Sequence, residues 1–219
     1  MERKKFKVAV TSSLNFPVKI EIVRKILDEF ADIIEEEMPF RKLSNKEVEE
    51  FGNRLSNYDG ILIRSGIFTE KFLGHLKVTR IIAVHGAGYD QIDVKAAQDL
   101  GIWVTNAPGA NANSVAELTI GLIVDLFRKI SFSNIQIKTN GDWEKTRKIG
   151  NKLFHHRLGI IGYGNIEKRV AKLAQSFGMF VYVYDPYILK GINKNKRITY
   201  CDKVEQLLGL SDIVTLHIP

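Results

Sequence analysis

A strand pattern, RLGII (157–161), leads directly into GYG (162–164) and then into a helical pattern that Gly178 closes. Gly162 permits a tight turn, and Gly164 lets the backbone come close to a pyrophosphate at the start of the helix. Strand, G-x-G and helix in this order predict a dinucleotide cradle. The alternative is an ordinary tight turn of an α/β domain.

An acid closes the next predicted strand, as a dinucleotide cradle requires. Asp185 ends FVYVYDP (180–186), about twenty residues after the turn. Its carboxylate would accept hydrogen bonds from both ribose hydroxyls and repel a 2′-phosphate, which favours NAD over NADP. The third glycine of the fingerprint is replaced by Glu167. Packing that side chain against the strand costs about 1–3 kcal/mol, and its charge opposes the phosphates, so we expect weakened cofactor affinity.

The first hundred residues alternate strand and helix patterns. The predicted strands cover 6–10, 59–64, 80–84 and 102–105. The predicted helices cover 17–30, 44–55, 69–76 and 93–100, and Ser44 and Glu47 are spaced as a capping box. This alternation predicts a parallel sheet with helices on both faces, whose ligands lie at the carboxyl ends of the strands.

A composition break at NAPGANANS (106–114) predicts the crossing between two domains. We therefore expect a substrate-binding domain over 1–108 and an NAD-binding domain over 109–219.

The second domain begins with an apolar helix over 114–130, in which Ser114 and Glu117 are spaced as a cap. Apolar residues surround this helix, which predicts burial between domains or between subunits. The polar stretch 131–150 predicts an arm or loop, and the nucleotide-binding half covers 155–219.

Composition narrows the class of protein. The most apolar window, LTIGLIVDLF (118–127), is too short to span a bilayer, so we expect no membrane partner. The single cysteine, Cys201, fits a reducing cytoplasm, and the five histidines form no recognisable metal set. The net charge of +7 is spread along the chain, which favours a solvated surface over a nucleic-acid site.

Seven segments resemble, in order and spacing, the D-isomer-specific 2-hydroxyacid dehydrogenases, a family that includes the phosphoglycerate, glyoxylate and D-lactate enzymes. They are RSG (64–66), HGAGYDQID (85–93), TNAPGANANSVAELTIGLI (105–123), GDWEK (141–145), LGIIGYGNI (158–166), FGMFVYVYDP (177–186) and SDIVTLHIP (211–219). The resemblance implies an α/β protein with a flavodoxin-like substrate domain, a doubly wound Rossmann domain for NAD, and a cleft between them. It also implies a homodimer and a small 2-hydroxy or 2-keto acid as substrate.

The resemblance implies specific site residues. Those on the substrate side are Arg64, Ser65, Gly66, Gly86, Ala87 and Gly88. Those around the cofactor are Ala87, Gly162, Tyr163, Gly164, Asn165, Ile166, Asp185, Pro186, His217, Ile218 and Pro219. Within this set Asn165 and Ile166 would follow the pyrophosphate, Asp185 the ribose, and 217–219 the adenine. Family members usually have Arg where this chain has Asn165, so one positive charge is missing.

The family's catalytic Arg, Glu and His all follow the segment that matches TLHIP (215–219), and none can be carried over. We therefore expect a C-terminally truncated chain that is inactive alone, with DIVTLHI (212–218) as an exposed apolar edge. His85 is the one plausible replacement base, but no carboxylate in the sequence is placed to orient it. The alternative is a non-catalytic NAD-sensing or protein-interaction module, similar to a corepressor.

Overall fold

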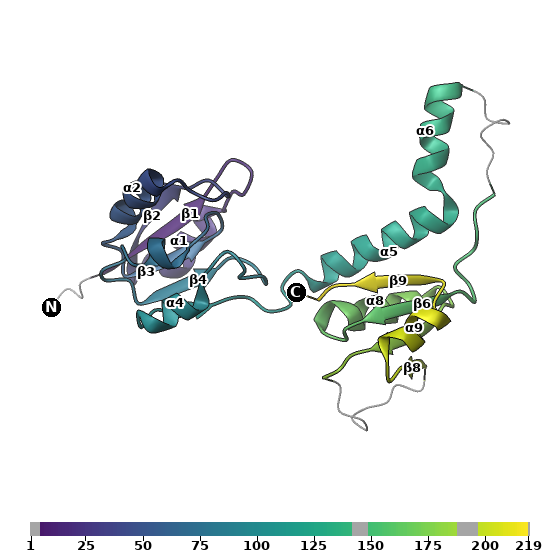
Figure 1. Cartoon of the computed structure of the whole chain (residues 1–219). Coiled ribbons are helices and arrows are strands. Elements are labelled where there is room, and N and C mark those ends of the chain that lie inside the picture. Colours follow the sequence, from purple (N-terminus) through teal and green to yellow (C-terminus); the bar gives the residue numbers. More distant parts are fainter. Residues whose placement is uncertain (1–4, 142–148, 188–196, 219) are drawn as a thin grey trace. The chain divides into compact units, whose positions relative to one another are not determined.

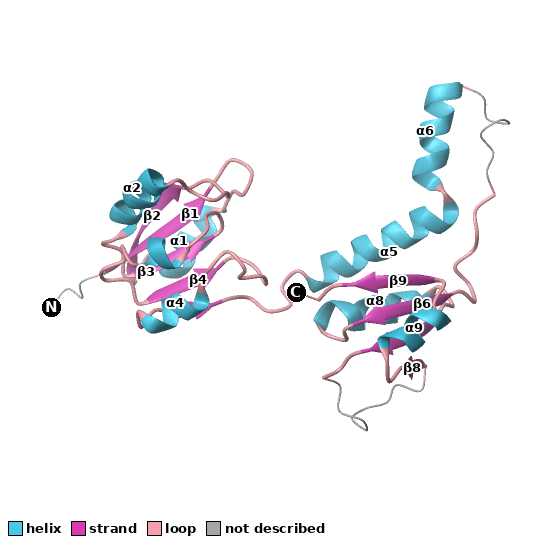
Figure 2. Ribbon diagram, viewed as in Figure 1, coloured by secondary structure: helices cyan, strands magenta, loops and turns pink. Residues whose placement is uncertain are grey.

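The computed structural model describes residues 5–141, 149–187 and 197–218, and it divides into two compact units. Unit 1 is Met1–Ala110 and unit 2 is Asn111–Pro219. Each unit holds a parallel sheet with helices packed on it, so the predicted α/β class is confirmed (Figures 1 and 2). Among the described residues, no helix is both long and apolar enough to cross a membrane.

Unit 1 contains a five-stranded parallel sheet in the order β2-β1-β3-β4-β5. Its strands are β1 (Phe6–Ser12), β2 (Ala31–Glu37), β3 (Gly60–Ile63), β4 (Ile81–Val84) and β5 (Trp103–Thr105). Its helices are α1 (Ile20–Leu27), α2 (Asn45–Leu55), α3 (Glu70–Leu73) and α4 (Val94–Asp99). The side chains of Phe68 and Phe72 are fully buried in its core, with ring centroids 4.7 Å apart.

The N-terminus of α2 is fixed by the predicted capping box. The Ser44 hydroxyl accepts a hydrogen bond from the Glu47 backbone N–H, and the Glu47 carboxylate accepts one from the Ser44 N–H. These bonds satisfy backbone groups that a helix end otherwise leaves open. The prediction from spacing alone is therefore confirmed.

One prediction for unit 1 needs correction, and one strand was missed. The helix expected over 17–30 covers only Ile20–Leu27, and strand β2 begins three residues after Asp28, at Ala31. This strand lies at the sheet edge, where only Ala31 and Ile33 are buried. Its acids gave no alternating apolar pattern because an edge strand has little surface to bury.

Unit 2 contains a four-stranded parallel sheet in the order β8-β7-β6-β9. Its strands are β6 (Arg157–Ile161), β7 (Phe180–Tyr184), β8 (Ile198–Tyr200) and β9 (Ile213–Leu216). Its helices are α5 (Ala112–Arg128), α6 (Ile130–Asn140), α8 (Asn165–Ser176) and α9 (Val204–Leu210). Gly178 follows α8 with φ +73°, the left-handed conformation expected of a residue that closes a helix. Within the described residues β9 is an edge strand, as predicted, and Leu216 is 57% exposed.

Helix α5 starts earlier than predicted and has two different faces. It begins at Ala112 after Asn111, without a side-chain cap, so the cap predicted at Ser114 is wrong. One face is buried and consists of Ala112, Ala116, Thr119, Ile120 and Ile123. The opposite face leaves three leucines exposed: Leu118, Leu122 and Leu126.

The predicted arm over 131–150 is wrong for its first half, where α6 continues the chain after a left-handed turn at Lys129. The Asp125 carboxylate accepts a hydrogen bond from the Ser131 N–H (2.6 Å), which ties the two helices together and lowers the pKa of Asp125. Most of the second half, including nearly all of GDWEK, lies outside the described residues.

An ion pair fastens the amino ends of β6 and β9. The Arg157 Nη2 atom donates to Asp212 Oδ1 (2.7 Å), and the Arg157 backbone N–H donates to Oδ2 (2.8 Å). The guanidinium and then the backbone N–H lower the pKa of Asp212 to about 2. Because the carboxylate is favoured in the folded state, this stabilisation is present above about pH 4 and is lost as the pH falls toward 2.

Replacing Asp212 with asparagine should therefore lower the unfolding temperature at pH 7, and the difference from the unmodified chain should shrink toward zero near pH 2. Thermal unfolding followed by circular dichroism at pH 7, 4 and 2 measures this. Asp99→Asn is the control, because it opens an exposed Lys95–Asp99 pair within one helix. A difference at Asp212 that persists undiminished at pH 2 would contradict the assignment.

Candidate functional site

The turn after β6 requires glycine at its first position. Gly162 has φ +86°, a conformation that side chains disfavour, and a Cβ there would lie 2.7 Å from Ile218 Cγ2. Gly164 occupies the N-cap position of α8. A Cβ at this residue would contact only the Glu167 side chain and no backbone atom. The two glycines thus make a close, narrow turn between strand and helix.

The N-terminus of α8 has no side-chain cap. Three helices of unit 1 have side-chain caps, supplied by Ser44, Thr69 and Asp93. Gly164 provides none for α8, so no side chain takes up the N–H groups of its first turn as a cap. Uncapped N–H groups and the positive end of the helix dipole favour a bound anion.

Asp185 is tied to this turn. Its Oδ2 atom accepts a hydrogen bond from the Tyr163 N–H (2.8 Å), and Oδ1 accepts one from the Tyr187 N–H (2.7 Å). A carboxylate has about four lone-pair sites, so both oxygens keep capacity for a further donor. The half-buried acid is thereby held rigidly at the carboxyl end of β7.

The remaining predicted cofactor residues of unit 2 lie on both sides of the turn. Asn165 is exposed and Ile166 is half-buried at the start of α8, whereas Pro186 is exposed after Asp185. At the end of β9 the His217 Nε2 atom is 2.9 Å from Thr215 Oγ1. Ile218 reaches the glycine turn, and Pro219 lies outside the described residues.

Arg169 belongs to the same region, and the sequence analysis missed it. Its Nη1 atom donates to the Asn165 carbonyl oxygen (2.6 Å), and its Nε donates to Asn113 Oδ1. A guanidinium is thus held one turn after the position where the family usually has Arg. The signal in the sequence was the i, i+4 spacing on the helix, which places both residues on one face.

Glu167 faces the turn from inside. It is only 4% exposed and is the one charged side chain among the buried described residues. Its Oε2 atom lies 3.0 Å from the position that a Cβ on Gly164 would occupy, and Oε1 lies 3.5 Å from the corresponding position on Gly162. The Glu167 carboxylate is therefore held against the two glycines and does not turn out to solvent.

The predicted substrate residues of unit 1 differ in what they can offer. Arg64 extends over the Phe16 ring at 5.5 Å, and its Nε atom is buried without a hydrogen-bond partner among the described residues. Ser65 is fully buried, and its hydroxyl donates to the Met38 carbonyl oxygen (2.6 Å). Gly66 (φ +114°) packs against Met38 Sδ, where a Cβ would lie at 2.6 Å. Arg64 therefore has free donor capacity, whereas the Ser65 hydroxyl maintains the fold.

The other segment predicted on the substrate side, Gly86–Ala87–Gly88, is anchored from the end of β5. The Ala107 N–H donates to the Gly86 carbonyl oxygen (2.9 Å), and Asn106 Nδ2 donates to the Ala87 carbonyl oxygen (2.7 Å). The sequence analysis gave no role to Asn106, although it follows a predicted strand directly. The loop is thus held in place by hydrogen bonds within unit 1.

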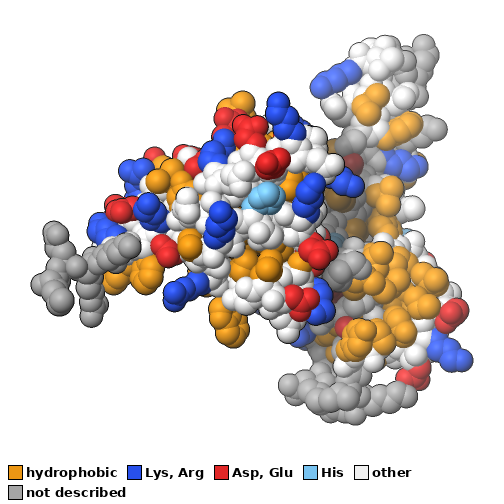
Figure 3. All heavy atoms as spheres, turned by 60° about the vertical axis from the view of Figure 1, so that its left-hand side comes forward, with side chains coloured by type: hydrophobic (Ala, Val, Ile, Leu, Met, Phe, Trp, Pro, Cys, Tyr) orange, Lys and Arg blue, Asp and Glu red, His pale blue; other side chains and the backbone are white. Residues whose placement is uncertain are grey.

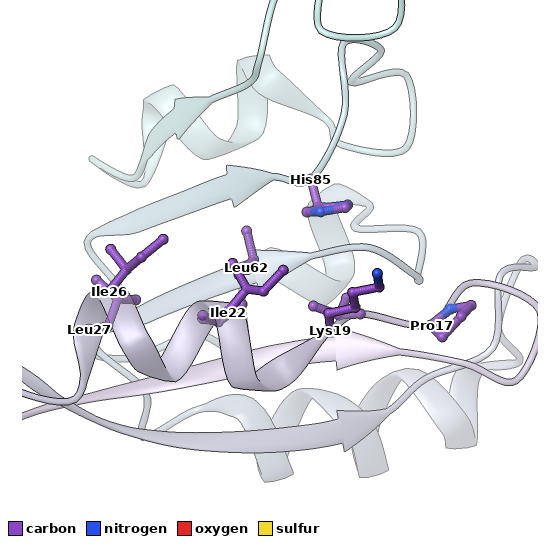
Figure 4. Close-up of a pocket in the computed structure, with 9 residues that line it drawn as sticks. Pro17, Lys19, Ile22, Ile26, Leu27, Leu62 and His85 are labelled. Atoms are coloured by element: carbon purple, nitrogen blue, oxygen red, sulfur yellow. The ribbon is translucent and has the colours of Figure 1, made fainter. Parts of the chain in front are cut away.

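His85 opens into an apolar groove of about 510 Å³ on unit 1. Figure 4 shows Ile22 on α1 beside Leu62 on β3, while His85 and Lys19 lie toward the end of the groove away from Ile26. His85 is exposed, and no hydrogen bond or ion pair joins its ring to a described carboxylate. The groove is lined mainly by hydrophobic side chains. Several of them belong to α1, none of whose residues is completely buried.

A second pocket, about 610 Å³, opens at the carboxyl ends of β1 and β2, where the sequence predicted nothing. It includes Phe16 and Phe40, whose ring centroids are 5.0 Å apart, and the guanidinium groups of Arg41 and Arg54. Arg54 binds Glu36 (2.8 Å) and Arg41 binds Glu47 (2.6 Å), so both cations are already paired.

Figure 3 shows Lys and Arg side chains interspersed with Asp and Glu over the face in view, in agreement with the charge spread along the sequence. In the part of the chain that the structure describes, no group of three His, Cys, Asp or Glu residues is arranged to hold a metal ion.

Known proteins are similar to this chain in both sequence and fold. Residues 9–210 match the family model described as D-isomer specific 2-hydroxyacid dehydrogenase, catalytic domain. D-3-phosphoglycerate dehydrogenase from Methanocaldococcus jannaschii is 34% identical over 203 residues, 92% of this chain and 38% of that protein. Hydroxypyruvate reductase from Thermotoga maritima is 38% identical over 174 residues, 79% of this chain and 55% of that protein.

A solved structure is similar over nearly the whole chain. The NAD+-bound 3-phosphoglycerate dehydrogenase from Entamoeba histolytica has a TM-score of 0.76 at 30% identity, and the match covers 99% of this chain and 63% of that one. The chain therefore spans less than two thirds of the length of these relatives. Since the family model covers most of its residues, the chain belongs to the D-isomer-specific 2-hydroxyacid dehydrogenase family.

Proposed function

We propose that this chain carries the dinucleotide site and part of the acid-binding site of an NAD-dependent 2-hydroxyacid dehydrogenase, which interconverts a 2-hydroxy and a 2-keto acid. The observation that carries the proposal is the Asp185 carboxylate, held 2.8 Å from the Tyr163 N–H beside an uncapped helix N-terminus. An acid at this place suits a ribose diol, and the open helix end suits phosphate.

The residues present fit NAD, with one group opposed. Asp185 would hold the adenosine ribose, and its charge would exclude the 2′-phosphate of NADP. His217 and Ile218 would line the adenine, and the first-turn N–H groups of α8 would bind the pyrophosphate. Glu167 opposes that last contact by its charge. When bound, the nicotinamide ring supplies or accepts a hydride.

Arg64 is the residue we assign to the acid substrate. Its Nε atom is buried and has no partner among the described residues, and such an atom is stabilised by an acceptor. A guanidinium suits a carboxylate, which every 2-hydroxy and 2-keto acid provides. The backbone N–H groups of Ala87 and Gly88, in a loop held by Asn106, would supply further donors that do not depend on a side chain.

Proton transfer needs an oriented acid–base group, and the described residues do not provide one. His85 is exposed and has no carboxylate partner there, so its ring is not oriented as an acid–base group requires. We therefore propose that the chain binds cofactor but does not turn over alone. The same observation supports a second candidate, a non-catalytic NAD-sensing module. For either candidate we propose a homodimer, supported by the exposed Leu118, Leu122 and Leu126 of α5.

Titrating the purified chain with NADH, followed by nucleotide fluorescence, tests the proposal. We expect saturable binding, and no oxidation of NADH when glyoxylate, pyruvate or a phosphorylated 2-keto acid is added. Absence of binding at millimolar NADH would rule out the cofactor site. Turnover with any of the acids would instead refute the proposal that the chain does not turn over alone.

A further inference from the structure

Glu167 occupies the place where a phosphate would approach the glycine turn. In a dinucleotide fingerprint, the missing Cβ of the second glycine is what allows the pyrophosphate to come close. Here that position is 3.0 Å from Glu167 Oε2, and the corresponding position on the first glycine is 3.5 Å from Oε1. Both carboxylate oxygens therefore lie against the two glycines that define the cradle.

The carboxylate has no other partner that would explain its place. The residue is 4% exposed, and no hydrogen bond or ion pair joins its carboxylate to another described residue, although the carboxylate oxygens keep some contact with solvent at the turn. The nearby cations are directed elsewhere: Arg169 donates to Asn165 and Asn113, and Lys168 lies 5.9 Å from the Tyr163 ring centroid. A carboxylate that has lost most of its water without gaining a partner is costly unless a favourable field offsets that loss.

The N-terminus of α8 supplies that field. Glu167 is in the first turn of a twelve-residue helix whose N-cap, Gly164, provides no side-chain cap. A negative charge in the first turn is stabilised by the helix dipole and by the open N–H groups. These are the same groups that would bind a pyrophosphate, so the carboxylate and the phosphates use one source of stabilisation.

We infer that Glu167 is an internal competitor of the cofactor's phosphates, and that it sets the dinucleotide affinity of this chain well below that of the same cradle without the charge. The inference rests on the proposed NAD site. The effect should be limited to the diphosphate part of the ligand. The ribose would be held by Asp185, which follows β7, whereas Glu167 lies in α8, which follows β6.

The variant Glu167→Gln tests this with little change in shape. Removing one like charge near a bound diphosphate should tighten NADH binding by at least about tenfold. Adenosine, which has no phosphate, should bind the variant and the unmodified chain equally. Glu167→Ala serves as a second variant, since it removes the carboxylate without leaving an amide in its place, and it should show the same gain for NADH only.

Glu205→Gln is the matched control, because it removes an exposed acid from the first turn of α9 in the same unit. It should leave both affinities unchanged. Affinities are measured by calorimetry on the whole chain. If the unmodified chain binds NADH and neither Glu167 variant binds it more tightly, or if adenosine gains equally, the competitor role is wrong. If no protein binds NADH at millimolar levels, the proposed function itself fails.

Discussion

Replacing Asp185 with asparagine should reduce the preference of the chain for NADH over NADPH by about a hundredfold. The amide can still accept the hydrogen bond from the Tyr163 N–H, now 2.8 Å from Oδ2, so the turn keeps an anchor. It loses the charge that strengthens bonds from the ribose hydroxyls and that repels a 2′-phosphate. NADH should therefore bind more weakly, and NADPH equally well or better.

Parallel titrations with NADH and NADPH measure this ratio, and circular dichroism checks that the fold is kept. Asp99→Asn is the control, since it removes an equal charge from an exposed site on unit 1. A ratio that stays the same in a folded Asp185→Asn protein would show that this carboxylate does not select the cofactor.

Truncating Phe72 to alanine should destabilise unit 1 by about 3–5 kcal/mol. The ring is fully buried, and it packs at 4.7 Å from Phe68 in a core that also includes Ile61 and Ile82 of the central strands. Removal of such a ring loses both its transfer free energy and its contacts, and it leaves a cavity that the parallel sheet cannot close.

Amide hydrogen exchange, read peptide by peptide, measures this loss in β3 and β4 separately from unit 2. Phe30→Ala is the control, because that ring is 55% exposed and should change exchange in those strands little. Since β3 leads into Arg64 and β4 into His85, loosening of these strands would also disturb the residues proposed to bind the substrate. A loss below about 1 kcal/mol would mean that the Phe68–Phe72 contact is not central to the core.

Local patterns predicted the parts of the fold whose cause is local. The glycine turn, the Ser44–Glu47 capping box and the alternation of strands and helices each depend on residues within one or two turns. Strand β2 was missed because its acids are satisfied from other elements: Glu35 by Ser12, and Glu36 by Tyr58 and Arg54. No window of sequence contains those partners.

The same distinction separates the site residues. Asp185 was placed correctly at the end of a strand, and its bond to Tyr163 spans 22 residues that a known motif already relates. The use of the Ser65 hydroxyl could not be predicted, because its acceptor, Met38, is 27 residues earlier and reaches it only through the packing of the sheet. The start of α5 at Ala112 likewise follows from burial of Ala112 and Ala116, not from the cap spacing at Ser114.

The register of β9 against β6 has a consequence for how unit 2 folds. Leu158 pairs with Ile213 and Ile161 with Leu216, so this ladder joins segments 55 residues apart. The chain must close that loop before any of these backbone bonds can form, and parallel pairings of this separation slow folding compared with hairpins or helices. During synthesis, one edge of β6 therefore stays unpaired until β9 has emerged from the ribosome, and chaperones can bind that edge in the interval.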